Sequence, residues 1–286
     1  MCRSPCLPEP WSGIRQRVIG VPISGAMRPN PLRSKWAAGR PALGSWVSIP
    51  SQLVAEAVAA NDLDYVVIDC QHGFIGFDDT VRMLAGLNTG GVTPIVRVPE
   101  LSTANISRVL DAGAMGVIIP MVNSAEEAAA AVSYTRLPPV GVRSIGAGRA
   151  LITEGADYYQ RANEEVACMP MIETMEAIDD LDNILSVPGI DVAYVGPSDL
   201  AVAMGYQPGT SAQPFLDMLD HIVEACNRHG VRPGIQATPG TAADRVARGY
   251  QMVTMMVDLP TFRAALARAI ADAAFTDEER PHPALY

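Results

Sequence analysis

The chain has 286 residues, of which 49% are apolar and 18% are charged, so it can build a large core and does not have the composition of a disordered protein. Its net charge of −10 disfavours nucleic acid as a main partner, because neutralising phosphates requires a basic face. No stretch approaches the ~18–20 consecutive apolar residues of a membrane span, so we expect no membrane partner.

Residues 1–40 differ from the rest of the chain. They carry six arginines, many prolines and no regular hydrophobic period, which predicts a flexible N-terminal arm. An alternative is that the natural start is Met27.

From Leu43 onward, short apolar runs alternate with segments of helical spacing. Eight such units predict a single α/β domain over residues 41–275, a (β/α)8 TIM barrel with a parallel sheet buried on both faces, followed by a tail at 276–286. The predicted strands are Leu43–Ile49, Asp64–Asp69, Pro94–Val98, Gly116–Pro120, Ala167–Ile172, Asp191–Gly196, Arg232–Gln236 and Gln251–Val257. The predicted helices are Ser51–Ala60, Phe77–Leu87, Thr103–Ala112, Ser124–Thr135, Thr174–Leu185, Ala212–His229, Thr241–Arg248 and Pro260–Ala274.

The widest gap between predicted strands separates the fourth from the fifth. It is rich in proline and glycine over 138–148 and continues into an extra predicted helix that ends near Ala162. The segment is either a plain connection or a long loop on the catalytic rim that closes over a ligand.

The counts of cysteine and lysine limit the chemistry. Five cysteines, at positions 2, 6, 70, 168 and 226, show no zinc-site spacing and suit a reducing cytoplasm. The single lysine, Lys35, precedes every predicted strand, so a Schiff-base mechanism, which needs a lysine in the site, is close to excluded.

Two acidic residues follow neighbouring strands at the end where this fold places its chemistry. Glu173 ends the fifth strand and Asp199 follows the sixth, so their carboxylates can meet. A divalent cation would remove their repulsion; oxygen ligands favour Mg²⁺ or Mn²⁺, with Co²⁺ and Zn²⁺ as further possibilities. The alternative is a pair of rim carboxylates held by salt bridges or helix N-termini.

Other polar residues end strands at the same rim. Arg97 either binds a carboxylate or oxyanion or forms an ion pair with Asp69 or Asp111. His72 is either a general base or a structural histidine.

Further residues near strand ends also have two possible roles. Trp46 either walls a pocket or packs in the core, and Asp258 ends the eighth strand as a charge facing the rim. The turn at 196–199 either presents the N–H groups of Ser198 and Asp199 to an anion or binds nothing. The loops after strands seven and eight are not glycine-rich, which disfavours a phosphorylated substrate.

In order and spacing, these residues resemble the HpcH/HpaI family of class II, metal-dependent pyruvate aldolases. The resemblance runs from about Leu43 to Ala274. It rests on residues 44–46, 64–73, 96–98, 110–114, 120–122, 138–148, 172–174 and 196–200.

The resemblance implies a reversible aldol cleavage of a 4-hydroxy-2-oxo acid to pyruvate and an aldehyde. It implies that Glu173 and Asp199 are metal ligands, that Arg97 stabilises an enolate, and that His72 is the catalytic base, oriented by Asp111. It also implies that Trp46 is a pocket residue and that the N–H groups of Ser198 and Asp199 hold the pyruvate carboxylate. The resemblance also implies a homo-oligomer, usually a hexamer, in which the last helix packs on a neighbouring copy of the chain.

One position departs from the family pattern. Many members have glutamate where this chain has Gln71, which keeps the hydrogen-bonding reach but removes a charge. The alternatives on the same barrel are an oxaloacetate-type decarboxylase, a lyase of CoA thioesters, and a non-catalytic barrel that binds a keto acid.

Overall fold

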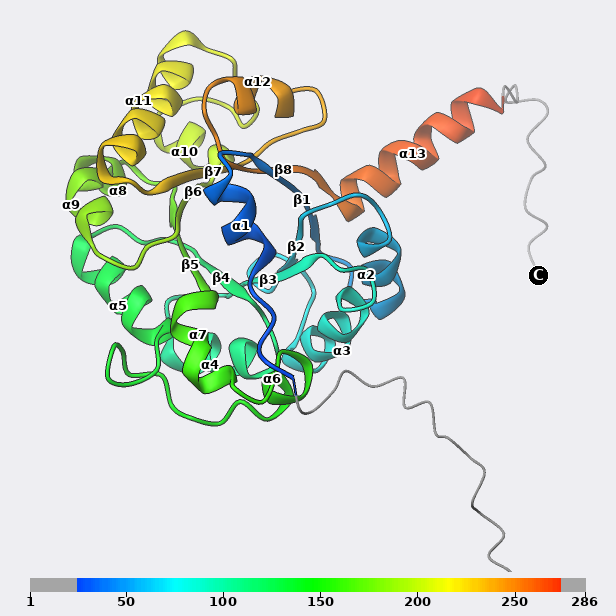
Figure 1. The fold of residues 1–286 in the computed structure, drawn as a ribbon. Helices are drawn as coiled ribbons and strands as arrows, with labels where there is room; N and C mark the ends of the chain where they lie inside the picture. Colours follow the sequence, from blue (N-terminus) through cyan, green and yellow to red (C-terminus); the bar gives the residue numbers. More distant parts are fainter. Residues whose placement is uncertain (1–24, 274–286) are drawn as a thin grey trace, which may run out of the picture.

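The structure, a computed structural model, describes residues 25–273. Eight parallel strands close into a barrel in chain order, with helices around it (Figure 1), which confirms the predicted TIM barrel. The strands are β1 (Ala42–Val47), β2 (Tyr65–Asp69), β3 (Thr93–Arg97), β4 (Gly116–Ile119), β5 (Ala167–Ile172), β6 (Val192–Val195), β7 (Arg232–Gln236) and β8 (Met252–Val257).

The helices follow the predicted order, with additions between strands. Among the described residues, none is long and apolar enough to cross a membrane. They are α1 (Pro31–Ala37), α2 (Gln52–Ala59), α3 (Phe77–Leu87), α4 (Thr103–Asp111), α5 (Ala125–Thr135), α6 (Gly148–Thr153), α7 (Tyr158–Glu165), α8 (Met175–Asp179), α9 (Leu181–Ser186), α10 (Pro197–Ala203), α11 (Gln213–His229), α12 (Ala242–Ala247) and α13 (Asp258–Asp272).

The helix predicted over Thr174–Leu185 is two helices in the structure, α8 and α9. The break falls at Asp180, which is the C-cap of α8 and the N-cap of α9. Its carboxylate accepts the backbone N–H of Ala125 at 2.9 Å, a contact that ties the break to the start of α5.

The prediction that residues 1–40 form one flexible arm is wrong for residues 30–37. Asn30 caps α1 by accepting the Leu32 N–H, and Leu32 and Trp36 are buried in the cluster that fills the barrel. The helix crosses the open N-terminal end of the barrel (Figure 1) and closes it. Residues 1–24, and the predicted tail at 276–286, lie outside the described residues.

The long segment between β4 and β5 does not lie on the catalytic rim, so the interpretation as a lid is wrong. Helix α5 has already carried the chain to the N-terminal end of the barrel before this segment begins. There Arg136 donates to the backbone oxygen of Val166, and the Leu137 N–H donates to Asn163. Instead of one extra helix, the segment contains α6 and α7.

Side chains fill the barrel interior, as in other barrels of this size. Tyr65 and Tyr194 both bond through their hydroxyls to the Thr254 hydroxyl, at 3.0 and 2.6 Å. Met169 and Met171 pack in the same cluster. The interior is therefore a packed core, and chemistry is confined to the barrel ends.

Candidate active site

Arg97 and Asp69 form a buried pair at the C-terminal end of the barrel. The two residues are register partners across β3 and β2. Arg97 donates from Nε to Asp69 Oδ1 at 2.9 Å and from Nη2 to Oδ2 at 2.7 Å, and both side chains are more than nine-tenths buried. The bidentate contact fixes the plane of the guanidinium. Of the two contacts that the sequence left open, the structure selects Asp69 as the ion-pair partner.

Trp46 lies beneath this pair. The Arg97 guanidinium sits 4.3 Å from the centre of the indole ring, and the indole stacks on Tyr194 at 5.8 Å. Because Trp46 is 2% exposed, it acts on the site through Arg97 as a cation–π floor. Arg97 Nη1 faces Met171 Sδ at 4.0 Å, so this nitrogen keeps strong donor capacity for another group.

Glu173 is a buried carboxylate with one oxygen held in place. It is 3% exposed, and its Oε1 accepts the Met121 backbone N–H at 2.8 Å. Oε2 lies over Gly196, where an added Cβ would come within 2.3 Å of it. Residue 196 must therefore be glycine for the carboxylate to keep this position.

Asp199 lies in the first turn of α10, next to Glu173. Burial is the main reason that the pKa of Glu173 is raised; the Met121 N–H lowers it, the Asp199 charge raises it and Arg97 lowers it. Asp199 is therefore close enough for its charge to act on Glu173, and a ligand shared by the two carboxylates stays a prediction. Asp199 and Ser198 are exposed, so both are open to a ligand.

The donor set fits a hard divalent cation. A buried carboxylate beside a second one is costly unless positive charge is nearby, and Arg97 is already committed to Asp69. Among the described residues, no cluster of three or more His, Cys, Asp or Glu forms a complete metal cage. Two carboxylates with room for outside oxygens match the partial protein coordination typical of Mg²⁺.

His72 and Asp111 do not meet within the chain, so the prediction that Asp111 orients His72 is wrong there. His72 is exposed on the turn after β2, and its backbone N–H donates to Asp69 at 3.2 Å. Asp111 is the last residue of α4, which ends at the opposite end of the barrel, and it pairs with Arg143 at 2.7 Å. A helix that follows a barrel strand runs back toward the strand starts, which is why the two residues are separated.

Asp258 is not a free charge at the rim. Its carboxylate accepts the N–H groups of Ser48, Ile49 and Leu259 and the Ser48 hydroxyl. It therefore ties the end of β8 to the loop after β1.

Two residues position the site in ways that the sequence did not predict: Asp69, which it named only as a possible ion-pair partner of Arg97, and Met121, which it did not single out. Asp69 also accepts the backbone N–H groups of Gln71 and His72, so one carboxylate fixes both Arg97 and the His72 turn. Met121 has φ of 56°, a left-handed conformation that its sequence does not signal. Gln71 lies in the same turn, and its buried Oε1 has no hydrogen-bond partner among the described residues.

Comparison with known proteins decides the family. A family model described as HpcH/HpaI aldolase/citrate lyase matches residues 42–265. The chain belongs to this family. The chain is 40% identical to a hydroxypyruvate/pyruvate aldolase from Rhizorhabdus wittichii. The alignment spans 247 residues and covers 85% of this chain and 98% of that protein.

Other relatives agree. The chain is 32% identical to a 5-keto-4-deoxy-D-glucarate aldolase from Shigella dysenteriae, over 83% of this chain and 94% of that protein. The solved structure of an HpcH/HpaI aldolase/citrate lyase family protein from Burkholderia cenocepacia superposes with a TM-score of 0.81 at 28% identity, over 86% of this chain and all of that one. The predicted enzyme class, a carbon–carbon lyase of the aldolase type, is thereby confirmed.

Proposed function

We propose that the chain cleaves a 4-hydroxy-2-oxo acid reversibly to pyruvate and an aldehyde, with a divalent cation held by Glu173 and Asp199. The names of the aldolase relatives support the reaction class. The observation that carries the proposal is the buried Glu173 beside Asp199, with the fixed guanidinium of Arg97 close enough to lower the Glu173 pKa.

Arg97 would hold the 2-oxo group. Its Nη1 is directed away from Asp69, and Trp46 and Asp69 prevent the guanidinium from turning. A fixed donor of this kind stabilises oxyanion charge as the carbon–carbon bond breaks, by a few kcal/mol. Arg97 therefore needs no rearrangement to act.

Two backbone groups and one side chain would complete the site. The N–H groups of Ser198 and Asp199, in the first turn of α10, have no partner within the helix and would bind the pyruvate carboxylate. His72, exposed on its turn, would take the proton from the C4 hydroxyl and later return it to carbon. Asp69 places both Arg97 and His72, and we assign it a positioning role.

Glu173 and Asp199 would hold Mg²⁺ or Mn²⁺. Co²⁺ or Zn²⁺ can take the place of these ions at oxygen ligands. When bound, the cation supplies Lewis-acid stabilisation of the enolate charge.

The test is an assay of pyruvate release across a panel of 4-hydroxy-2-oxo acids, with and without EDTA. We expect EDTA to abolish the activity and Mg²⁺ or Mn²⁺ to restore it, and Glu173→Ala to be inactive. Glu224→Ala, at an exposed carboxylate on α11, is the matched control and should keep full activity. Full activity in EDTA, or in Glu173→Ala, would contradict the proposal, and CO₂ release from oxaloacetate without aldehyde chemistry would favour the decarboxylase.

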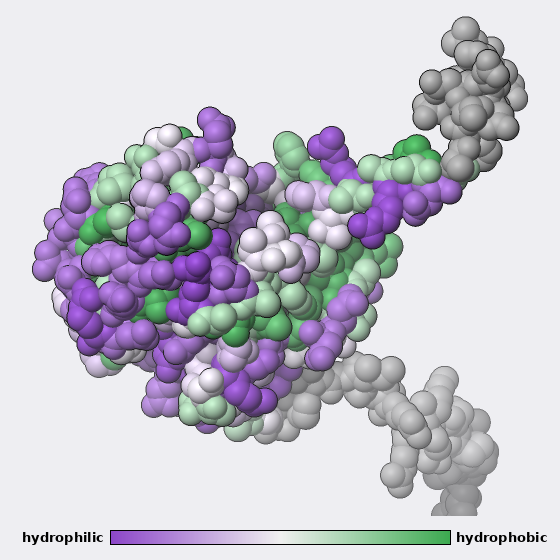
Figure 2. Space-filling model, turned by 90° about the horizontal axis from the view of Figure 1, so that it is seen from above, coloured by the Kyte–Doolittle hydropathy of each residue, from purple (hydrophilic) through white to green (hydrophobic). Residues whose placement is uncertain are grey.

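We also propose that the chain acts as a homo-oligomer in which α13 packs on a second copy, with six copies as the expected number. Helix α13 leaves the barrel and extends away from it (Figure 1). It exposes Phe262, Leu266 and Ile270 on one side, with exposed fractions of 62, 50 and 56%. Apolar surface also gathers at the side of the barrel next to the base of this helix (Figure 2). The apolar side of α13 in each copy would therefore pack on the apolar surface of the barrel in a second copy.

We also propose that the protein is located in the cytoplasm. Cys70, Cys168 and Cys226 are free thiols, which supports a reducing compartment.

A further inference from the structure

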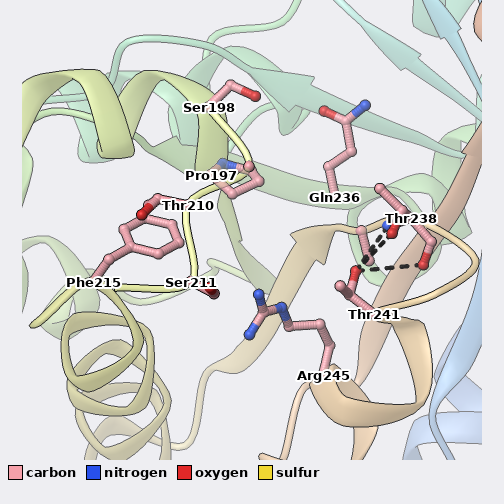
Figure 3. Close-up of a pocket in the computed structure, with 11 residues that line it drawn as sticks. Pro197, Ser198, Thr210, Ser211, Phe215, Gln236, Thr238, Thr241 and Arg245 are labelled. Carbon is pink, nitrogen blue, oxygen red and sulfur yellow. Dashed lines mark hydrogen bonds between the residues drawn. The ribbon is translucent and has the colours of Figure 1, made fainter. Parts of the chain in front are cut away.

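A cavity of about 210 Å³ lies between α3 and α4, next to the turn that follows β2; we call it the α3–α4 cavity. The turn contributes Cys70 to its lining, and the loop after β3 contributes Pro99. It shares no lining residue with the cavity beside Ser198 that Figure 3 shows. The two spaces are therefore separate, and nothing in the proposed reaction uses the α3–α4 cavity.

The inner wall of this cavity is apolar, or has its polar groups already paired. Ile75 and Val109 line it and are buried, with exposed fractions of 8 and 5%. Cys70 Sγ lies 3.3 Å from the Thr80 hydroxyl, which donates to the Gly76 carbonyl oxygen at 2.9 Å. Since an apolar cavity of about 150 Å³ is enough to bind benzene, this space suits a single ring.

Hydrogen-bond donors lie where the cavity opens to solvent. Arg108 lines the cavity and is exposed, and its guanidinium carbon stacks 3.9 Å from the centre of the Phe77 ring. Stacking uses the face of the guanidinium and leaves its N–H groups, which lie in the plane, able to donate. Among the described residues, Arg108 has no ion-pair partner, and the side chain of Asn105, one turn earlier on α4, has no hydrogen bond. The opening therefore offers a positive charge and an amide to an anion.

Cys70 connects the cavity to the candidate active site. It follows Asp69 directly in the chain, and its backbone N–H donates to the Arg97 carbonyl oxygen at 2.9 Å. Asp69 in turn binds the Arg97 side chain and the His72 N–H. A ligand that contacts Cys70 would therefore stabilise the turn in this arrangement without touching the reacting atoms.

We propose that the α3–α4 cavity binds a small aromatic carboxylate, with its ring against Ile75 and Val109 and its carboxylate on Arg108, and that this ligand is an effector of the enzyme. A carboxylate is favoured over a phosphate because one guanidinium balances about one negative charge, whereas a phosphate monoester carries about −1.5 to −2. A ring is favoured over a flexible chain because it loses little conformational entropy in a compact space. The ligand site is independent of the proposed function, and the effector role rests on it.

Chemical modification of Cys70 reports whether the cavity is occupied. The full chain is treated with methyl methanethiosulfonate, and the Cys70 peptide is followed by mass spectrometry, with the buried Cys168 and Cys226 as references. Protection is the ratio of the rates without and with ligand in the same variant, so a change in thiol reactivity cancels. We expect benzoate to slow the modification at least fivefold, and benzyl alcohol, which has the ring but no charge, to slow it less than twofold.

Variants of the cation test its role. Arg108→Gln should remove the protection by benzoate, and Arg108→Lys should keep part of it. Arg82→Gln, at an exposed arginine on α3 that does not line the cavity, is the matched control and should keep all of it. Equal protection by benzoate in Arg108→Gln, or equal protection by benzyl alcohol in the unmodified chain, overturns the carboxylate site.

Pyruvate release tests the effector role. We expect benzoate to raise kcat at least twofold, because it holds the turn that carries His72, and Arg108→Gln to abolish the rise. A rise in KM alone, equal in both chains, would mean competition at the proposed site and contradicts the role. An unchanged kcat despite protection of Cys70 overturns the effector role, and the ligand site stands. If no pyruvate is released but Cys70 is still protected, the proposed reaction falls and the ligand site stands.

Discussion

The two ends of the barrel treat buried charge in opposite ways. At the N-terminal end, Asp191 accepts Arg33 at 2.8 Å and Arg136 at 3.3 Å, and the Asn30 N–H donates to Glu165 at 2.7 Å. At the C-terminal end, the Asp199 charge adds to burial in raising the pKa of Glu173, and the nearby Arg97 is already bound to Asp69.

The difference separates stability from chemistry along one axis of the molecule. A network in which acids and bases are matched holds the chain ends and loops in place without outside help. Two neighbouring carboxylates without a cationic partner in the protein reduce the stability of the fold. Such an arrangement is found where a bound ligand compensates for the repulsion. Changes at the two ends should therefore have opposite effects on folding and on turnover.

The largest effect should follow from Glu173→Gln. We expect pyruvate release to fall on the order of 10³-fold, because the amide cannot hold a cation while its oxygen still accepts the Met121 N–H. The same change should raise the melting temperature of the chain in EDTA, since it removes a carboxylate whose pKa burial raises.

The sign of the pH dependence follows from that raised pKa. Folding favours the protonated form of Glu173, so its favourable contribution is present at low pH and is lost as pH rises through the folded-state pKa. The melting-temperature advantage of Glu173→Gln in EDTA should therefore be larger at about pH 8 than at about pH 5, by a few °C. A smaller melting-temperature advantage at the higher pH would show that positive charge within the protein already compensates for the Glu173 carboxylate.

At the opposite end, Asp191→Asn should reduce stability and spare catalysis. Arg33 and Arg136 would lose their shared partner, and the free energy of unfolding should fall by about 3 kcal/mol. Urea unfolding measures the loss, and kcat should stay within about threefold. Arg82→Gln, which breaks the exposed pair with Asp79 and leaves the Asp79 contact with the Gly76 N–H, is the control and should leave the urea midpoint unchanged. A loss of kcat in step with Glu173→Gln would remove the distinction between the ends.

The smallest effect concerns the backbone under Glu173. Met121 adopts φ of 56°, so Met121→Gly should be more stable than Met121→Ala by about 0.5–1 kcal/mol, since both remove the half-exposed side chain and only alanine keeps the strain. At Val202 in α10, the alanine variant should instead be the more stable one. The same order at both positions would mean that residue 121 stores no strain.

The fold was predictable because buried parallel strands leave a strong signal. Each predicted strand agrees with the structure to within a residue or two at its ends, and the strand-end positions of Glu173 and Arg97 followed directly. The placement of Glu173 and Asp199 at the same end of the barrel was predictable for the same reason, since adjoining parallel strands end at one edge.

Features that depend on side-chain contacts were not predictable. Helix α1 is short and begins at a proline, so its sequence shows no helical hydrophobic period. It is held in place by the burial of Leu32 and Trp36. The separation of Asp111 from His72, in contrast, follows from the predicted barrel, in which the helix after the third strand ends away from the rim; the role implied by the family resemblance overlooked that rule. The cavity lined by Pro197, Phe215 and Arg245 lies between the first turn of α10, the loop before α11 and the β7–α12 loop, so no single segment of the sequence predicts it.

The outward course of α13 also affects how the enzyme behaves on dilution. If the apolar side of this helix is covered only by a neighbouring copy, each subunit is stabilised by mass action, and its persistence depends on how many copies surround it. A cell that makes little of this protein would then hold fewer working catalysts than its chain count implies, because scarce subunits would separate and unfold before they could act.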